Sequence, residues 1–153
     1  MRVGSIGQRE WVIDQSPRPG TVAVVADEAR MMQAMLNLAT NAVQHTTDCD
    51  EIGIGAEHLT LNGVDSIRCW VRDTGPGIED EHLDKLFRRQ FRGVASRAAR
   101  SEGMGLGLSI VDAIARAHGG TASARNEPTG GARFVIEIPA EPPDDLATQE
   151  NLP

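Results

Sequence analysis

The chain of 153 residues contains no tyrosine, and aromatic residues make up only 3% of it. It also lacks an excess of positive charge, because 22 acidic residues outnumber 15 Lys and Arg and give a formal net charge of -7. General nucleic-acid binding needs a basic face and is therefore not expected. No apolar run approaches the roughly 18 residues of a membrane span, and Met1 begins no secretory signal, so we expect no direct membrane contact from this chain.

Cysteine is scarce as well. The two cysteines, Cys49 and Cys69, form no CxxC or zinc-type set. Cys69 falls in the apolar phase of a strand pattern and is expected to be a small buried hydrophobe, whereas Cys49 lies in an acidic, polar segment. A reduced, cytoplasmic setting is favoured by this usage, and a disulfide between the two cysteines remains an alternative.

What is present suits one domain with a sizeable core. Apolar periodicity and turn signals predict strands at 9–14, 21–26, 51–61, 64–73, 121–126 and 132–139, and helices at 28–46, 79–87 and 108–118. This order predicts an α+β fold, a two-layer α/β sandwich with a mixed sheet covered on one face by about three helices. We expect an N-terminal flank at 1–9, the domain at 10–139 and a disordered, acidic tail at 140–153.

The first predicted helix separates apolar from amide side chains. At about 100° per residue, one stripe gathers Met32, Met35, Leu36, Ala39, Ala42 and Val43, and the opposite side gathers Asn37, Asn41, Gln44 and His45. Two asparagines one turn apart offer two carbonyl oxygens, and Mg²⁺ is held by such oxygens together with phosphate and water. Taken alone, the pair favours an ordinary polar helix face over a metal site.

Glycines precede the helix predicted at 108–118. Gly103, Gly105 and Gly107 alternate in "GMGLGLSIV" just before the helix begins. Bare backbone N–H groups at a helix N-terminus bind anions, and glycine lets a phosphate approach closely. No Gly-Lys-Ser/Thr follows, so this is not a Walker loop, and neither the spacing nor a preceding strand supports a dinucleotide fingerprint.

A carboxylate ends the strand predicted at 64–73. Asp73 is followed by Gly75 and Gly77 around a proline, which taken alone indicates a turn. An aspartate at a strand end can also accept a hydrogen bond from an exocyclic amine such as adenine N6, with the glycines making room for the base. Together with the paired asparagines and the glycine segment, it describes a site for a purine triphosphate with Mg²⁺.

Four segments, in this order and spacing, resemble the N, G1, F and G2 boxes of sensor histidine kinases: "NLATNAVQHT", "DTGPGI", "LFRRQF" and "GMGLGLSIV". The resemblance covers roughly residues 10 to 139. It implies the Bergerat ATP-binding fold, which this family shares with the Hsp90, MutL and gyrase ATPases.

The resemblance also implies roles for individual residues. Asn41 would coordinate Mg²⁺ and take part in catalysis, Asp73 would hold the adenine amine, and His45 would pack on the adenine. Phe87 would pack against a nucleotide-responsive lid at 88–103, hinged at Gly93 and Gly103. The full set implied to bind ATP is Asn37, Asn41, Gln44, His45, Asp73, Gly75, Gly77, Ile78, Phe87, Gly103, Met104, Gly105, Leu106, Gly107 and Leu108.

Three positions depart from the family pattern and put ATP affinity or rate in question. Gln44 stands where a Lys or Arg is frequent, Gln90 where a second phenylalanine is frequent, and Arg133 where a small hydroxyl residue is frequent.

The chain has four histidines, none of them in the sequence setting of a phosphoacceptor. The resemblance therefore implies a helical dimerisation and phosphoacceptor domain as partner, fused or in trans, a downstream response regulator, and a cytoplasmic location for a kinase that can be membrane-anchored at full length. One alternative is a degenerate or anti-sigma-like module that acts by binding a partner. Another is an autonomous ATPase, disfavoured because Asn37 stands where such ATPases carry a water-activating glutamate.

Overall fold

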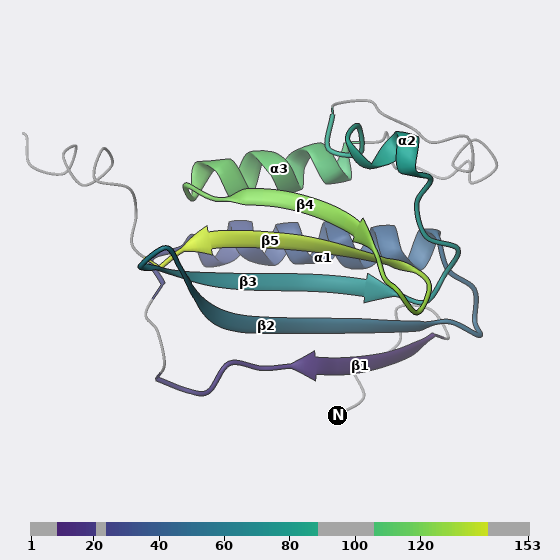
Figure 1. Cartoon of the computed structure of the whole chain (residues 1–153), viewed down its shortest axis with the longest axis horizontal. Helices are drawn as coiled ribbons and strands as arrows, with labels where there is room; N and C mark the ends of the chain where they lie inside the picture. Colours follow the sequence, from purple (N-terminus) through teal and green to yellow (C-terminus); the bar gives the residue numbers. More distant parts are fainter. Residues whose placement is uncertain (1–8, 21–23, 89–105, 141–153) are drawn as a thin grey trace, which may run out of the picture.

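The computed structural model describes residues 9–20, 24–88 and 106–140, which form a sheet with helices on one side (Figure 1). The elements in chain order are β1 (Glu10–Gln15), α1 (Glu28–Gln44), β2 (Glu51–Leu61), β3 (Val64–Asp73), α2 (Asp80–Leu83), α3 (Gly107–Ala117), β4 (Thr121–Asn126) and β5 (Ala132–Pro139). The two hairpins, β2–β3 and β4–β5, have the bounds that the sequence predicts.

The five strands of the described residues form one mixed sheet in the order β1-β2-β3-β5-β4. β1 pairs parallel to β2, with a shift in register between Ile13 and Gln15, and every other neighbouring pair is antiparallel. A parallel pair needs a crossover connection, and α1 provides it between β1 and β2. The predicted mixed sheet is thus confirmed, with β1 and β4 as its edges.

The core lies between the sheet and the two longer helices, α1 and α3, which lie on the same face of the sheet (Figure 1). Its largest fully buried side chains are Leu38, Ile52, Val71, Val111 and Ile136, contributed by both helices and by β2, β3 and β5. This is the expected two-layer sandwich. Within the described ranges no helix combines the length and the apolar character that crossing a membrane requires.

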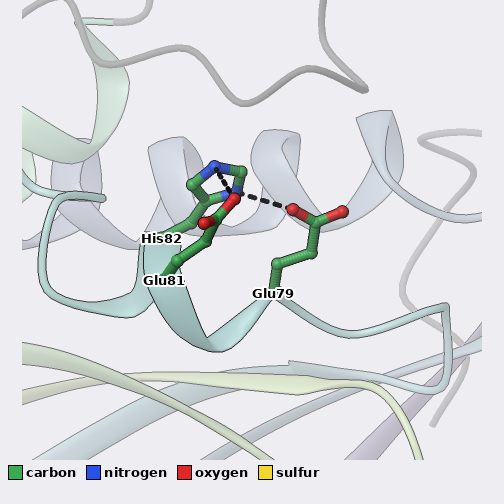
Figure 2. A group of neighbouring side chains, drawn as sticks. All are labelled: Glu79, Glu81 and His82. Atoms are coloured by element: carbon green, nitrogen blue, oxygen red, sulfur yellow. Dashed lines mark ion pairs between the residues drawn. The ribbon is translucent and has the colours of Figure 1, made fainter.

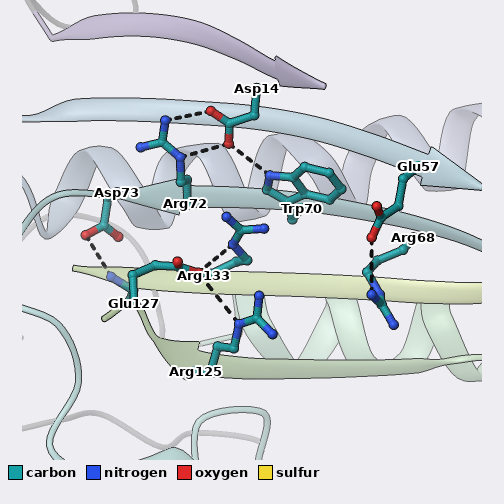
Figure 3. A network of polar contacts seen from close by, with 10 residues as sticks. Asp14, Glu57, Arg68, Trp70, Arg72, Asp73, Arg125, Glu127 and Arg133 are labelled. Carbon is teal, nitrogen blue, oxygen red and sulfur yellow. Dashed lines mark hydrogen bonds and ion pairs between the residues drawn. The ribbon is translucent and has the colours of Figure 1, made fainter. Parts of the chain in front are cut away.

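The other sheet face carries several pairs of opposite charges (Figure 3). Arg72 Nη2 lies 2.6 Å from Asp14 Oδ1 and 2.7 Å from Glu51 Oε1, and Arg68 pairs with two further glutamates. Trp70 is only 3% exposed on this face, because its ring lies against Gly55 and beneath the Arg133 guanidinium, 5.1 Å from the ring centroid. Trp70 is thus buried on this face among ion pairs and a cation–π contact.

Two predicted elements and one open alternative are corrected. The segment predicted as a strand at 21–26 has no regular structure at 24–26, where the chain crosses from the sheet edge towards α1; residues 21–23 lie outside the described part. The helix predicted at 79–87 spans only Asp80–Leu83 and continues as turns. Cys49 and Cys69 are free thiols, so the alternative of a disulfide between them is excluded.

The apolar stripe predicted for α1 is rotated about the helix axis. Met32 and Leu36 are 57% and 50% exposed, whereas Ala34 and Leu38 are fully buried. Of the predicted members, Ala39 and Ala42 are buried, and Met35 and Val43 are partly buried against the core. Alanines at the centre of the stripe let α1 approach both the sheet and α3 closely, which a stripe centred on large residues would prevent.

We predict opposite outcomes for two leucines of α1 that lie two residues apart. Leu38→Ala leaves a cavity in the core and should lower the free energy of unfolding by about 2–5 kcal/mol. Leu36→Ala, at a half-exposed position, should lower it by no more than about 0.5 kcal/mol. Urea denaturation of both variants checks this, and equal losses would contradict the orientation of α1.

Candidate functional site

Asp73 is the buried carboxyl group at the end of β3. It lies opposite Ile52 in the ladder and is 3% exposed. Its Oδ1 accepts hydrogen bonds from the backbone N–H of Gly75, at 2.9 Å, and of Ala132, at 3.4 Å. Burial raises the pKa of this carboxyl, against the lowering effect of those two hydrogen bonds. Both bonds end on Oδ1, so Oδ2 is the oxygen that a ligand can use.

The loop after Asp73 is held from two sides. Thr74 exchanges hydrogen bonds with the backbone of Glu51, at 3.1 and 2.9 Å. Asn126, at the end of β4, accepts from the N–H of Ile78 at 2.8 Å and donates to its carbonyl at 2.7 Å. Gly77 lies between them with a φ of +79°, a conformation in which a side chain is strained, and a Cβ there would meet Asn126 Oδ1 at 2.9 Å. The glycine loop is thus a fixed wall beside Asp73.

The C-terminal end of α1 forms the facing wall. Asn37 and Asn41 are half-buried, one turn apart, while Gln44 and His45 at the helix end are exposed. A Cβ on Gly75 would lie 2.9 Å from the His45 carbonyl oxygen, so the glycine loop packs directly on this helix end. His45 also lies close enough to Asp73 to lower the pKa of that carboxyl slightly, against the larger effect of burial.

The N-terminus of α3 lies next to Asn37, the first of the two asparagines. Asn37 Nδ2 donates to the carbonyl of Gly107 in the first turn of α3, at 3.4 Å. This first turn has no acidic residue, and the N-cap Leu106 offers no side chain to the free N–H groups. A helix N-terminus of that kind favours an anion such as a phosphate group. Leu106, Gly107 and Leu108, for which the phosphate-binding role stays a prediction, lie half-buried at this N-terminus.

Phe87 packs on the core rather than on the site of Asp73. Its ring meets Phe134 edge to face, with centroids 6.5 Å apart. It also lines a cavity of about 450 Å³ with Leu106, Ser109, Ile110, Asp112 and Ala113. Neither Asp73 nor Asn41 borders this cavity, which shares Leu106 with the N-terminal turn of α3.

A cluster of possible metal ligands lies at α2 (Figure 2). His82 has Glu79 3.5 Å from Nδ1 and Glu81 3.4 Å from Nε2. It is the one His, Cys, Asp and Glu group in the described ranges compact enough to share an ion. The two carboxylates approach opposite ring nitrogens, and a single ion binds one of these, so the cluster is not arranged around one point.

Part of the expected site falls outside the described residues: Gln90, Gly93, Gly103, Met104, Gly105 and the predicted lid from 89 onward. Arg133 is described and points away from the site. Its side chain lies on the open sheet face, paired with Glu127 and stacked on Trp70 (Figure 3). The neighbour Ala132 faces Asp73 instead. The concern that Arg133 perturbs ATP binding directly is therefore not supported.

Sequence reasoning missed the residues that shape the loop from a distance. Asn126 contacts Ile78 across 48 positions, and Gly131, with a φ of +89°, packs its backbone against the Asp73 carbonyl. The sequence "EPTGG" signals a turn, but no local pattern indicates which loop the turn meets.

The comparisons with known proteins identify the family to which this fold belongs. The family model described as histidine kinase-, DNA gyrase B- and HSP90-like ATPase matches residues 26–142. The signal transduction histidine-protein kinase BaeS of Escherichia coli K12 is 35% identical over 123 residues, which cover 80% of this chain and 26% of BaeS. The chain thus spans about a quarter of the length of this curated relative.

Solved structures that resemble this chain come from the same family. The catalytic domain of histidine kinase ThkA has a TM-score of 0.70 and 29% identity, covering 88% of this chain and 82% of that one. ThkA in complex with the response regulator protein TrrA has a TM-score of 0.63 and 30% identity, covering 85% and 35%. The chain belongs to the family of histidine kinase-, DNA gyrase B- and HSP90-like ATPases, and its ATP-binding domain is of the sensor histidine kinase type.

Proposed function

We propose that this chain presents Mg-ATP for phosphoryl transfer to a histidine on a separate dimerisation and phosphoacceptor domain, as the catalytic part of a two-component sensor histidine kinase. The observation that carries the proposal is Asp73, a buried carboxyl with a raised pKa and one unused oxygen, placed between the glycine loop and the end of α1. Such a group is costly to bury without a ligand to recognise.

The residues around Asp73 fit an adenine base. Oδ2 can accept from an exocyclic amine, and Gly75 and Gly77 bring backbone, rather than side chains, to the edge of the space. His45 and Ile78 border the same region from α1 and from the loop. We assign the base to these residues.

Asn41 and Asn37 fit the metal and the phosphates. Their amides offer oxygen ligands at the half-buried side of α1, and Asn37 contacts the uncapped N-terminal turn of α3. When bound, Mg-ATP supplies the transferable phosphoryl group and the metal charge that neutralises its oxygens. Asn41 would hold the metal, Asn37 would support it while bridging to α3, and the first turn of α3, with Gly107 and Leu108, would orient phosphate oxygens. Catalysis by this chain is then positioning and electrostatic stabilisation.

The phosphoacceptor is assigned to another domain, fused or in trans. His118, for example, is engaged in structure: Nε2 accepts from the Asp27 N–H at 3.0 Å, and Nδ1 lies 2.7 Å from the Ile114 carbonyl. By analogy with the ThkA complex, a response regulator is the proposed downstream partner. We assign the domain to 10–139, from the first residue of β1 to the last of β5, and keep a cytoplasmic location as a prediction.

The metal assignment predicts that Asn41→Ala weakens Mg-ATP binding. A magnesium site with only one or two protein ligands loses a large share of its protein contacts, so we expect about a tenfold loss, or 1.4 kcal/mol. Isothermal titration with and without Mg²⁺ measures it, with the exposed neighbour Thr40→Ala as control. Unchanged affinity in folded Asn41→Ala would remove Asn41 from the metal site, and no ATP binding by the wild type would favour a degenerate module.

Asp73→Asn is expected to separate stability from binding. Folding opposes ionisation of Asp73, so as the pH rises above 3.8, the ordinary value for an aspartate, the unfolded chain releases this proton first. The wild-type free energy of unfolding therefore falls as the pH rises from 3.8 towards the higher pKa of Asp73 in the folded protein, and it stays lower at neutral pH. The asparagine variant lacks this loss, and its stability relative to the wild type should increase from about pH 4 to about pH 7.

The same variant should bind ATP about tenfold more weakly and discriminate less against GTP, because a base amine left without its acceptor costs about 1–3 kcal/mol. Denaturation at several pH values checks the predicted change in stability, and calorimetry checks the predicted change in ATP binding. The exposed position Asp84→Asn serves as control for both. Equal ATP affinity in both proteins would show that Asp73 does not read the base.

The chain alone should bind ATP but neither label itself nor release phosphate steadily. None of its histidines has the sequence setting of a phosphoacceptor, and Asn37 is a poor base for activating water. Incubation with γ-labelled ATP, alone and with a helical phosphoacceptor domain from a related kinase, tests this. Acid-labile label should appear on the added domain only; steady phosphate release by the chain alone would instead make it an ATPase.

A further inference from the structure

Arg9, immediately before β1, reaches the C-terminal end of α1. Its Nη2 donates to the carbonyl of Val43 at 2.9 Å and to that of Thr46 at 2.6 Å, and its Nε donates to Thr46 Oγ1 at 3.2 Å. The side chain is 16% exposed and lies 4.0 Å from an Asp48 oxygen. The guanidinium is thus held by one helix end across more than thirty positions of sequence.

This end of α1 needs a cation and donors from outside the helix. The last carbonyls of a helix have no partner within it, and the helix dipole makes them attractive to positive charge. The last turn of α1 contains no basic residue. The helix's own cap uses the His45 N–H for the Asn41 and Ala42 carbonyls, and Thr46 Oγ1 donates to Ala42 at 2.7 Å. Arg9 serves the carbonyls of Val43 and Thr46.

The segment that Arg9 holds is also a wall of the proposed nucleotide site. Asn41 and His45 lie in the last turn and at the cap of α1. The glycine loop rests on the same segment: a Cβ on Gly75 would lie 2.9 Å from the His45 carbonyl and 3.2 Å from Thr46 Cγ2. Releasing the helix end would therefore move a metal ligand, a base-packing residue and the support of the glycine loop together.

We propose that Arg9 is a positioning residue of the nucleotide site, fixing the end of α1 so that Asn41, His45 and Gly75 keep their relative places. The inference rests on the proposed function, because it concerns binding of Mg-ATP at that site. Arg9 itself donates to protein carbonyls and need not touch the nucleotide. Its neutral replacement should loosen the helix end without removing any group that contacts the ligand.

The test uses the full 153-residue chain with Arg9→Ala, Arg9→Lys and a matched control, Arg68→Ala. Arg68 is also a paired arginine, bound to Glu57 and Glu137 on the open sheet face, so its loss breaks ion pairs without touching α1. Calorimetry with Mg-ATP is run well below the melting temperature of each protein. We expect about a tenfold weaker affinity for Arg9→Ala, the size of effect known for residues that orient the groups in direct contact with a bound metal. Arg9→Lys should show a smaller loss, and Arg68→Ala should keep the wild-type affinity.

Amide resonances give a readout that a general loss of stability does not move. In ¹⁵N spectra without nucleotide, Arg9→Ala should shift the His45 and Gly75 signals and Arg68→Ala should leave them in place. Equal Mg-ATP affinity in folded Arg9→Ala, or an equal loss in Arg68→Ala, overturns the inference. Should Arg9→Ala not fold, Arg9→Lys decides, because one ammonium cannot reproduce the fork to both carbonyls and wild-type affinity would then overturn it. Absence of ATP binding by the wild type would instead reject the proposed function.

Discussion

The burial of one carboxyl group, Asp73, is the constraint around which the site is arranged. An isolated charge taken out of water is unfavourable, and its main local compensation is two backbone N–H groups on Oδ1. Those donors belong to the glycine loop and to the start of β5, so both must approach closely. They can do so because Gly131 packs its backbone against the Asp73 carbonyl, where any side chain would collide. The geometry that keeps Asp73 buried is also the geometry that gives the site a narrow wall of bare backbone.

The parts of the fold that depend on local signals could be read from the sequence. Strands β2 and β3 alternate apolar and polar residues with a period of two, and the turn between them is Asn62-Gly63, which adopts φ of +52° and +81°. The same holds for the hairpin of β4 and β5. Asp73 could be singled out because it ends a strand just where two glycines follow, and this pattern can be recognised from the local sequence alone.

What could not be predicted depends on contacts distant in sequence. The buried stripe of α1 is centred on Ala34 and Leu38, because α3 and the sheet select small residues at the contact, whereas a count of apolar side chains favours Met32 and Leu36. Likewise, the direction of Arg133 is set by Trp70 and Glu127 on the open face. The sequence around Asn126 predicts no role for it, because its two hydrogen bonds go to Ile78, in a loop that lies next to it only after folding.

The lengths of the strands bear on self-association. The outermost strands, β1 and β4, have six residues each, while the inner strands have eight to eleven. An outer strand exposes unpaired backbone groups that can recruit a strand from another molecule, and short, irregular or charged strands resist this. β1 combines brevity with a shift in register and carries Glu10 and Asp14, and β4 ends in Arg125 and Asn126. Concentrated solutions of the domain should therefore be protected from edge-to-edge aggregation on both sides of the sheet.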